Sequence, residues 1–100
     1  MKRQRTPTGA RIRELRRAAG LKLADVSAHM GVSVSYMSSI EIGDRCLHDL
    51  VSINRLVMLL LPNAGTAHVS ACTRDLVRLI CRDYGYVTIP SEEYLVLPHG

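Results

Sequence analysis

Basic side chains that could bind the phosphates of a polyanion are concentrated at the start of the chain. The first 22 residues contain eight basic residues and one acid, a net charge of +7, whereas the other 78 residues carry a net charge of −3. The chain has no Trp or Phe to anchor it in a lipid surface, so this charge favours nucleic acid over a membrane. The eight basic residues are Lys2, Arg3, Arg5, Arg11, Arg13, Arg16, Arg17 and Lys22.

A serine-rich stretch, "MGVSVSYMSSIEIG" at residues 30–43, could contact the edges of DNA bases. At 100° per residue, Met37 and Ile40 would mark the buried side of a helix in this stretch. A serine hydroxyl can donate to or accept from any base edge, and a valine can touch a thymine methyl group. A solvated face without function is the alternative interpretation. The residues expected on the outward side, facing the bases, are Val34, Ser35, Ser38 and Ser39.

Phosphate contacts are expected from the sides of this helix, from the exposed face of the first helix of the chain and from an N-terminal arm. Tyr36 could reach a phosphate oxygen through its hydroxyl, or its ring could pack on the core. The predicted backbone contacts are Tyr36, Lys22, Arg11, Arg13, Arg17 and Arg45. Arg3 and Arg5, with Lys2 beside them, could enter a minor groove, and a solvated tail is the alternative.

The cysteines give no clear metal or disulfide pattern. Three cysteines without a CxxC pair argue against a disulfide framework and favour a reduced cytoplasm. His68 and Cys72 could share a helix face near Cys81, but buried thiols are the preferred interpretation, so no metal site is expected.

Catalytic and membrane signatures are also weak. Acid–imidazole pairs occur at Asp25 with His29 and at His48 with Asp49, but no nucleophile or oxyanion-hole signature joins them. We therefore expect neither an enzyme nor a cofactor. No apolar segment follows the basic start, and the longest apolar run is interrupted by polar residues, so neither a signal peptide nor a membrane span is expected.

Apolar residues at helical spacing predict three helices before residue 44. The first opens at residues 6–8 and stops at Gly20, and the second ends at Gly31. Ser33 is expected to cap the third helix, which ends at Gly43.

The rest of the chain is predicted to hold two more helices and a β segment. The fourth helix ends in "LVMLLL", so apolar that the rest of the domain or a second subunit must cover it. Residues 62–72 indicate a connector, after which Thr73 caps a helix that ends at Gly85. Residues 86–89 and 94–97 are rich in β-forming residues and predict a hairpin or two short strands. A short helix capped by Ser91 is the alternative.

These features resemble the Cro/C1-type (XRE) helix-turn-helix family of phage and bacterial repressors. The segment "RIRELRRAAGLKLADVSAHMGVSVSYMSSIEIGDR" and the helix after it carry the resemblance, over residues 8–61. The turn glycine of the family matches Gly31, and the small residue between the two helices matches Ser27. The apolar core positions match Val26, Met30, Val32, Met37 and Ile40.

The resemblance implies a mainly α fold, a Cro/C1-type helix-turn-helix bundle of four to five helices. A C-terminal helix and a short β-strand or hairpin extension would follow it. The expected organisation is a basic arm at residues 1–7, a DNA-binding domain at 8–61, a connector at 62–72 and a dimerisation extension at 73–100.

The resemblance also assigns roles to individual residues. The family's ion pair between helix one and the end of helix three matches Arg16 and Glu41. A partner is required in any case, because an exposed Glu41 would oppose the helix dipole and repel DNA phosphates. The family commonly has Ser or Thr followed by Gln at the start of helix two, and here Lys22 could hold the phosphate as a point charge. The base-contact positions of the family match Val34, Ser35 and Ser39.

We therefore expect a sequence-specific transcriptional regulator of double-stranded DNA, a homodimeric repressor or autorepressor on a short inverted repeat. Leu56 to Leu61 and the C-terminal segment are the expected homodimer contact. The alternative is an antitoxin-like interaction protein, whose C-terminal segment binds a protein partner while the helix-turn-helix autoregulates. The expected location is the cytoplasm of a bacterial or phage-infected cell, where DNA would hold the protein at the nucleoid.

Overall fold

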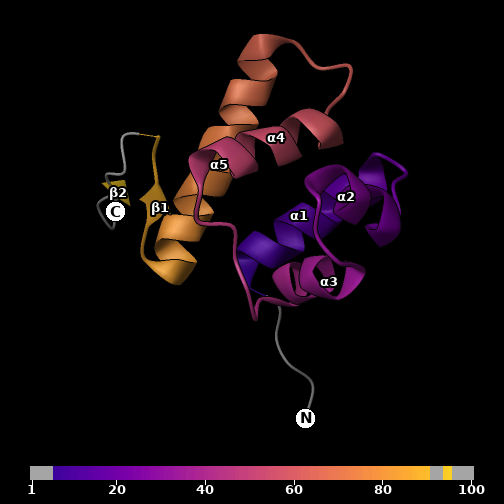
Figure 1. The fold of residues 1–100 in the computed structure, drawn as a ribbon. Helices are drawn as coiled ribbons and strands as arrows, with labels where there is room; N and C mark the ends of the chain where they lie inside the picture. Colours follow the sequence, from indigo (N-terminus) through magenta and orange to yellow (C-terminus); the bar gives the residue numbers. More distant parts are fainter. Residues whose placement is uncertain (1–5, 91–93, 96–100) are drawn as a thin grey trace.

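The computed structural model describes residues 6–90 and 94–95, and in these it contains five helices followed by a two-stranded hairpin (Figure 1). The mainly α fold with a short β extension, predicted from the sequence, is confirmed. No helix in this part of the chain is long and apolar enough to cross a membrane. The elements are α1 (Pro7–Ala18), α2 (Leu23–Met30), α3 (Val34–Ile42), α4 (Leu50–Leu60), α5 (Thr66–Tyr84), β1 (Val87–Thr88) and β2 (Tyr94–Leu95).

Side-chain caps and glycines set the ends of the first three helices. The hydroxyl of Thr6 accepts a hydrogen bond of 3.1 Å from a backbone N–H in the first turn of α1. Ser33 caps α3 in the same way, at 3.0 Å. Gly31 ends α2 with φ +70° and Gly43 ends α3 with φ +106°, left-handed conformations that favour glycine. The short turn between α2 and α3 is therefore encoded locally.

One apolar core runs from α1 to β1 in the described residues and includes both C-terminal helices. Leu56, Val57 and Leu60 of α4 are at most 2% exposed, and α5 packs against this helix. The apolar end of α4 is therefore covered by the rest of the chain. The predicted homodimer contact over Leu56 to Leu61 is wrong for these three residues, whereas Met58 remains 57% exposed.

Helix α5 begins at Thr66, and its N-cap Gly65 lies eight residues before the predicted cap at Thr73. Residues 66–72 were predicted to belong to a connector, but no glycine or proline interrupts the sequence from residue 66 to residue 84. Val69 and Cys72 also pack against the core at helical spacing. Thr73 does not cap the helix; it is buried and its hydroxyl donates to the carbonyl of Val69 at 2.8 Å. Apolar contacts therefore extend the helix through a segment whose composition indicated a loop.

The C-terminal segment forms the predicted hairpin, with β1 antiparallel to β2 and Val87 opposite Leu95. Val87 is fully buried and closes the core at this end. The N–H of Thr88 donates to the carbonyl of His48, so β1 also joins the segment before α4. Ser91, the cap of the alternative helix, lies outside the described residues, as do the last two residues of the predicted second strand.

Candidate nucleic-acid interface

Helices α2 and α3 are the two helices of a helix-turn-helix, joined by residues 31–33. Ser27 is 4% exposed, and its hydroxyl donates to the carbonyl of Ala24 at 3.0 Å. Its own carbonyl accepts a 3.0 Å hydrogen bond from the N–H of Val32, just after the turn at Gly31. The buried Ser27 hydroxyl therefore has a hydrogen-bond partner, and the Ser27 carbonyl connects α2 to the residue that follows the turn glycine.

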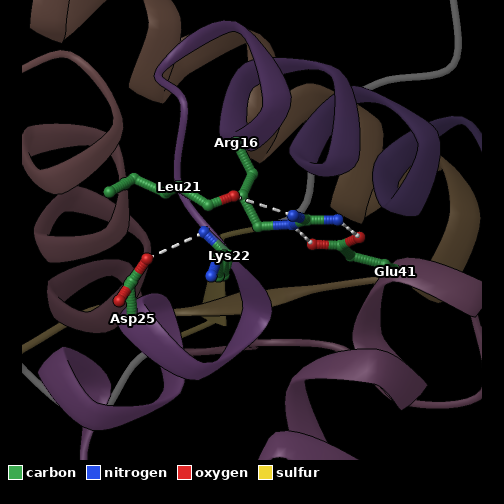
Figure 2. A network of polar contacts seen from close by, with 5 residues as sticks. All are labelled: Arg16, Leu21, Lys22, Asp25 and Glu41. Carbon is green, nitrogen blue, oxygen red and sulfur yellow. Dashed lines mark hydrogen bonds and ion pairs between the residues drawn. The ribbon is translucent and has the colours of Figure 1, made fainter.

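Arg16 and Glu41 form a bidentate ion pair between α1 and α3 (Figure 2). Nε of Arg16 donates to Oε2 of Glu41 at 2.6 Å, and Nη2 donates to Oε1 at 3.0 Å. Nη1 donates to the carbonyl of Leu21 at 2.9 Å, in the loop between α1 and α2. The two side chains are only 12% and 3% exposed, and the hydrogen bond with Glu41 raises the pKa of Arg16. The structure thus brings together the two residues that were predicted to form an ion pair. Arg16 also connects α1, the loop after it and α3.

Helix α1 lies close against the backbone of α3 at Gly9, a residue that the sequence analysis did not single out. A Cβ atom at Gly9 would lie 2.8 Å from the carbonyl oxygen of Ile40 and closer still to that of Glu41. Both atoms belong to the backbone of α3 and cannot rotate away. Any side chain at Gly9 would therefore force the two helices apart, and a glycine in the first turn of a predicted helix was the available signal.

The outward face of α3 is uncharged and is open to solvent in its first turn. Val34 is 46% exposed and Ser35 is exposed, whereas Ser38 and Ser39 are half-buried. Met37, on the opposite side, is fully buried. The hydroxyl of Ser39 donates to the carbonyl of Ser35 at 2.9 Å, so its proton is used within the helix and its oxygen is left as an acceptor. Val34 and Ser35 are therefore the most accessible of the four predicted base contacts.

Tyr36 lies at the side of α3, half-buried against the core. The guanidinium carbon of Arg45 lies 5.5 Å from the centroid of the Tyr36 ring, within the range of a cation–π interaction. Arg45 itself is exposed. The Tyr36 ring therefore packs against the core, which is one of the two interpretations of the sequence, and a cationic group lies over the same ring.

The three arginines of α1 predicted to contact phosphates differ in their surroundings. Arg17 is exposed and Arg13 is half-buried, and both line a shallow depression with Ala10 and Glu14. Nη1 of Arg11 pairs with Oε1 of Glu14 at 2.6 Å on the surface. Within residues 6–90, Arg13 and Arg17 form no ion pair, so their charges are more available to an anion than that of Arg11.

Lys22 occupies the N-cap position of α2, and it is exposed. Its backbone N–H donates to Oδ2 of Asp25 at 2.9 Å. The Asp25 carboxylate therefore caps α2, a structural role that accounts for one member of the Asp25–His29 pair. The predicted arm residues Lys2, Arg3 and Arg5 lie outside the described part of the chain.

A polar cluster at the start of α1 was missed by the sequence analysis. The N–H and the hydroxyl of Thr8 donate to Oδ2 of Asp83, at 3.0 and 2.7 Å. The hydroxyl of Tyr84 donates to the carbonyl of Gly43 at 3.0 Å and lies 3.0 Å from the hydroxyl of Thr6. The partners come from opposite ends of the chain, so no local sequence pattern could reveal the cluster.

The surroundings of the cysteines and of the His48–Asp49 pair indicate structural roles. Burial raises the pKa of Cys46 to about 12 and also raises the pKa of Cys72, which makes both thiols poor nucleophiles. His48 stacks on Tyr86 with ring centroids 4.3 Å apart, while the carboxylate of Asp49 caps α4. In the part of the chain that the structure describes, no three His, Cys, Asp or Glu side chains are grouped to hold a metal ion.

Comparison with known families identifies the same segment as the geometry does. The model of a helix-turn-helix domain family matches residues 8–60, just over half of the chain. The match runs from α1 to the end of α4 and contains the ion pair, the turn and α3. No curated protein and no solved structure matches the chain.

Proposed function

The chain belongs to the family of helix-turn-helix domains, of the kind typical of XRE/Cro-like regulators, and we propose that it is a homodimeric transcriptional repressor of double-stranded DNA. Domains of this family are DNA-binding modules of regulators and are not an enzymatic kind of domain. The outward face of α3 carries the proposal, because it is uncharged, exposed in its first turn and accompanied by the cation of Arg45 beside Tyr36.

Base contacts would come mainly from Val34 and Ser35 in the first turn of α3, the part of a recognition helix that usually enters the major groove. Ser39 would contribute as a hydrogen-bond acceptor, because its proton is engaged by Ser35, and Ser38 would lie at the margin. Serine side chains are short, so the helix must approach the groove floor closely or act through water. We expect sequence discrimination to be spread over several weak contacts and over DNA shape.

Phosphate contacts would fix the position of α3 on the duplex. Lys22 sits at the start of α2 and Arg45 just after α3, so a cation lies beside each of these helices. The arginines of α1 extend the same positive charge. The full set proposed for the backbone is Tyr36, Lys22, Arg11, Arg13, Arg17 and Arg45, with Arg3 and Arg5 from the arm.

A homodimer would place two such helices on half-sites about 34 to 36 Å apart. With Leu56, Val57 and Leu60 in the core, the dimer contact would use the exposed side of α4 and the C-terminal segment. Val51 and Met58, seven residues apart on one face of α4, are 50% and 57% exposed. Such a dimer would repress by covering an operator and excluding RNA polymerase.

Selection of bound sites from random DNA, followed by fluorescence anisotropy across a salt series, tests the proposal. We expect log K to fall linearly with log salt, by about 0.9 for each phosphate contacted. Val34→Asp would place a carboxylate in the groove and should weaken binding at least about tenfold, because like charges at an interface are strongly unfavourable. Ser39→Ala should have a smaller effect.

Ser70→Ala is the matched control, since Ser70 is exposed on α5 and has no proposed contact. Binding that is indifferent to salt would contradict the phosphate contacts. A Val34→Asp variant that binds like Ser70→Ala would remove α3 as the recognition helix.

A further inference from the structure

Three segments that are distant in the sequence meet at the last turn of α5 through a chain of hydroxyl groups. The hydroxyl of Tyr84 donates to the carbonyl of Gly43, the residue that ends α3, at 3.0 Å. Its single proton is then used, so the 3.0 Å contact between the hydroxyls of Tyr84 and Thr6 must have Thr6 as the donor. The Thr6 oxygen meanwhile accepts from the N–H of Gly9 at 3.1 Å. Every hydroxyl proton in this chain of hydrogen bonds therefore has an acceptor.

Close packing accompanies these hydrogen bonds. A Cβ atom at Gly43 would lie 2.8 Å from Cγ2 of Thr6 and 3.2 Å from its backbone nitrogen. The backbone that enters α1 thus passes directly over the residue that ends α3. Asp83, next to Tyr84, holds the N–H and the hydroxyl of Thr8 at 3.0 and 2.7 Å. Two neighbouring residues of α5 therefore fix the start of α1 against the end of α3, on the side of the molecule where α5 ends (Figure 1).

The five residues before Thr6 carry three of the basic side chains, Lys2, Arg3 and Arg5. Five residues span at most about 17 Å, so what they can reach is decided by the position of Thr6. We propose that Tyr84 is a positioning residue for DNA binding, which sets the point beside the recognition helix from which the basic arm starts. This inference rests on the proposed DNA-binding function and assigns to α5 a part in it.

A role of Tyr84 in stability alone would predict a different outcome. Loss of the hydroxyl would then lower the amount of folded protein. The folded fraction would bind DNA as before, whether or not the arm is charged. If Tyr84 acts through the arm, its removal should matter only when the arm is charged. A double-mutant cycle separates the two.

The experiment uses full-length protein and the DNA selected from a random pool, with all variants measured at a temperature where each is folded by circular dichroism. Tyr84→Phe is combined with an arm variant in which Lys2, Arg3 and Arg5 are alanine. Thr73→Val is the matched control, because it removes a buried hydroxyl from the same helix without touching Thr6. The readouts are the dissociation constant and the slope of log K against log salt.

We expect Tyr84→Phe to reduce the magnitude of the slope by about 0.9 for each phosphate that the arm no longer binds. For each such phosphate, the loss of affinity between 50 and 200 mM salt should be about 3.5-fold smaller than in the wild type. In the alanine-arm background Tyr84→Phe should leave affinity and slope unchanged, and Thr73→Val should leave both unchanged in either background. Equal effects of Tyr84→Phe in both backgrounds, or no effect in either, would overturn the inference while DNA binding stands. A wild-type chain that selects no DNA would overturn the proposed function itself.

Discussion

Replacing Glu41 with alanine tests how much of the fold depends on the ion pair between α1 and α3. The substitution removes two hydrogen bonds, of 2.6 and 3.0 Å, and leaves the guanidinium of Arg16 with its single bond to Leu21. Arginine does not lose its proton inside a protein, so Arg16 would stay charged and its guanidinium would have to be solvated at its partly buried site. Breaking one side of a buried pair in this way costs about 3 to 5 kcal/mol.

Two structural details place the expected value at the lower end of that range. The Arg16 side chain retains 12% exposure, so water can partly hydrate it once Glu41 is gone. Glu41 also lies in the last turn of α3, where removing a carboxylate relieves about 0.3 to 1 kcal/mol of unfavourable interaction with the helix dipole. We therefore expect a loss near 3 kcal/mol at neutral pH. This corresponds to a fall in melting temperature of about 4 to 8 °C per kcal/mol for a domain of this size.

Urea unfolding followed by circular dichroism measures this loss, and the double variant Arg16→Met with Glu41→Leu is its control. If the stranded charge is the cause, the double variant should be more stable than Glu41→Ala, because apolar pairs of similar volume often replace buried ion pairs without loss. A loss below about 1 kcal/mol for Glu41→Ala, the level of an exposed pair, would refute the reasoning. So would a double variant no more stable than the single one.

Three further predictions concern packing, ionisation and assembly. Gly9→Ala should destabilise the protein by about 1 to 3 kcal/mol in a urea titration, because the new Cβ atom would meet the backbone of α3. The control is Gly65→Ser at the open N-cap of α5, which should be tolerated or slightly stabilising in the same titration. Burial raises the pKa of Tyr84 above its ordinary value of 10.0, so its contribution to stability is complete below pH 10 and is lost as the pH rises through the folded-state pKa. Unfolding measured from pH 8 to pH 11.5 should show this decline, and Tyr84→Phe should reduce it. Met58→Glu should shift the protein towards the monomer in light scattering without unfolding it, and a dimer that persists would exclude the exposed side of α4 as the contact.

Features that depend on neighbouring residues were predictable from the sequence. The cap at Ser33 and the left-handed turn at Gly31 each follow from residue types within one helical turn, and both are present. The buried side of α3 followed from the spacing of Met37 and Ile40. The helix-turn-helix was visible for this reason, since it is built from short local signals.

Features that depend on contacts between distant segments were not predictable. The early start of α5 is stabilised by the packing of Val69 and Cys72 on the core, which overrides a composition of small and polar residues. The hydrogen bonds from Thr8 to Asp83 join residues 75 positions apart. At the candidate interface, the spacing placed Ser39 on the outward face but could not show that its hydroxyl proton is engaged by the helix backbone.

The core that α4 and α5 share determines which segment of this chain could be transplanted into another protein as a unit. The stretch that matches the helix-turn-helix family ends at residue 60, yet α4 at its end packs against α5 and shares one apolar core with it. A graft of residues 8–60 into another protein would carry nine of the fifteen buried apolar residues of the described core, and its host would have to supply a substitute for the other six. The segment that the family shares is therefore shorter than the segment that builds the core, and we expect that a functional transplant has to extend through Val87.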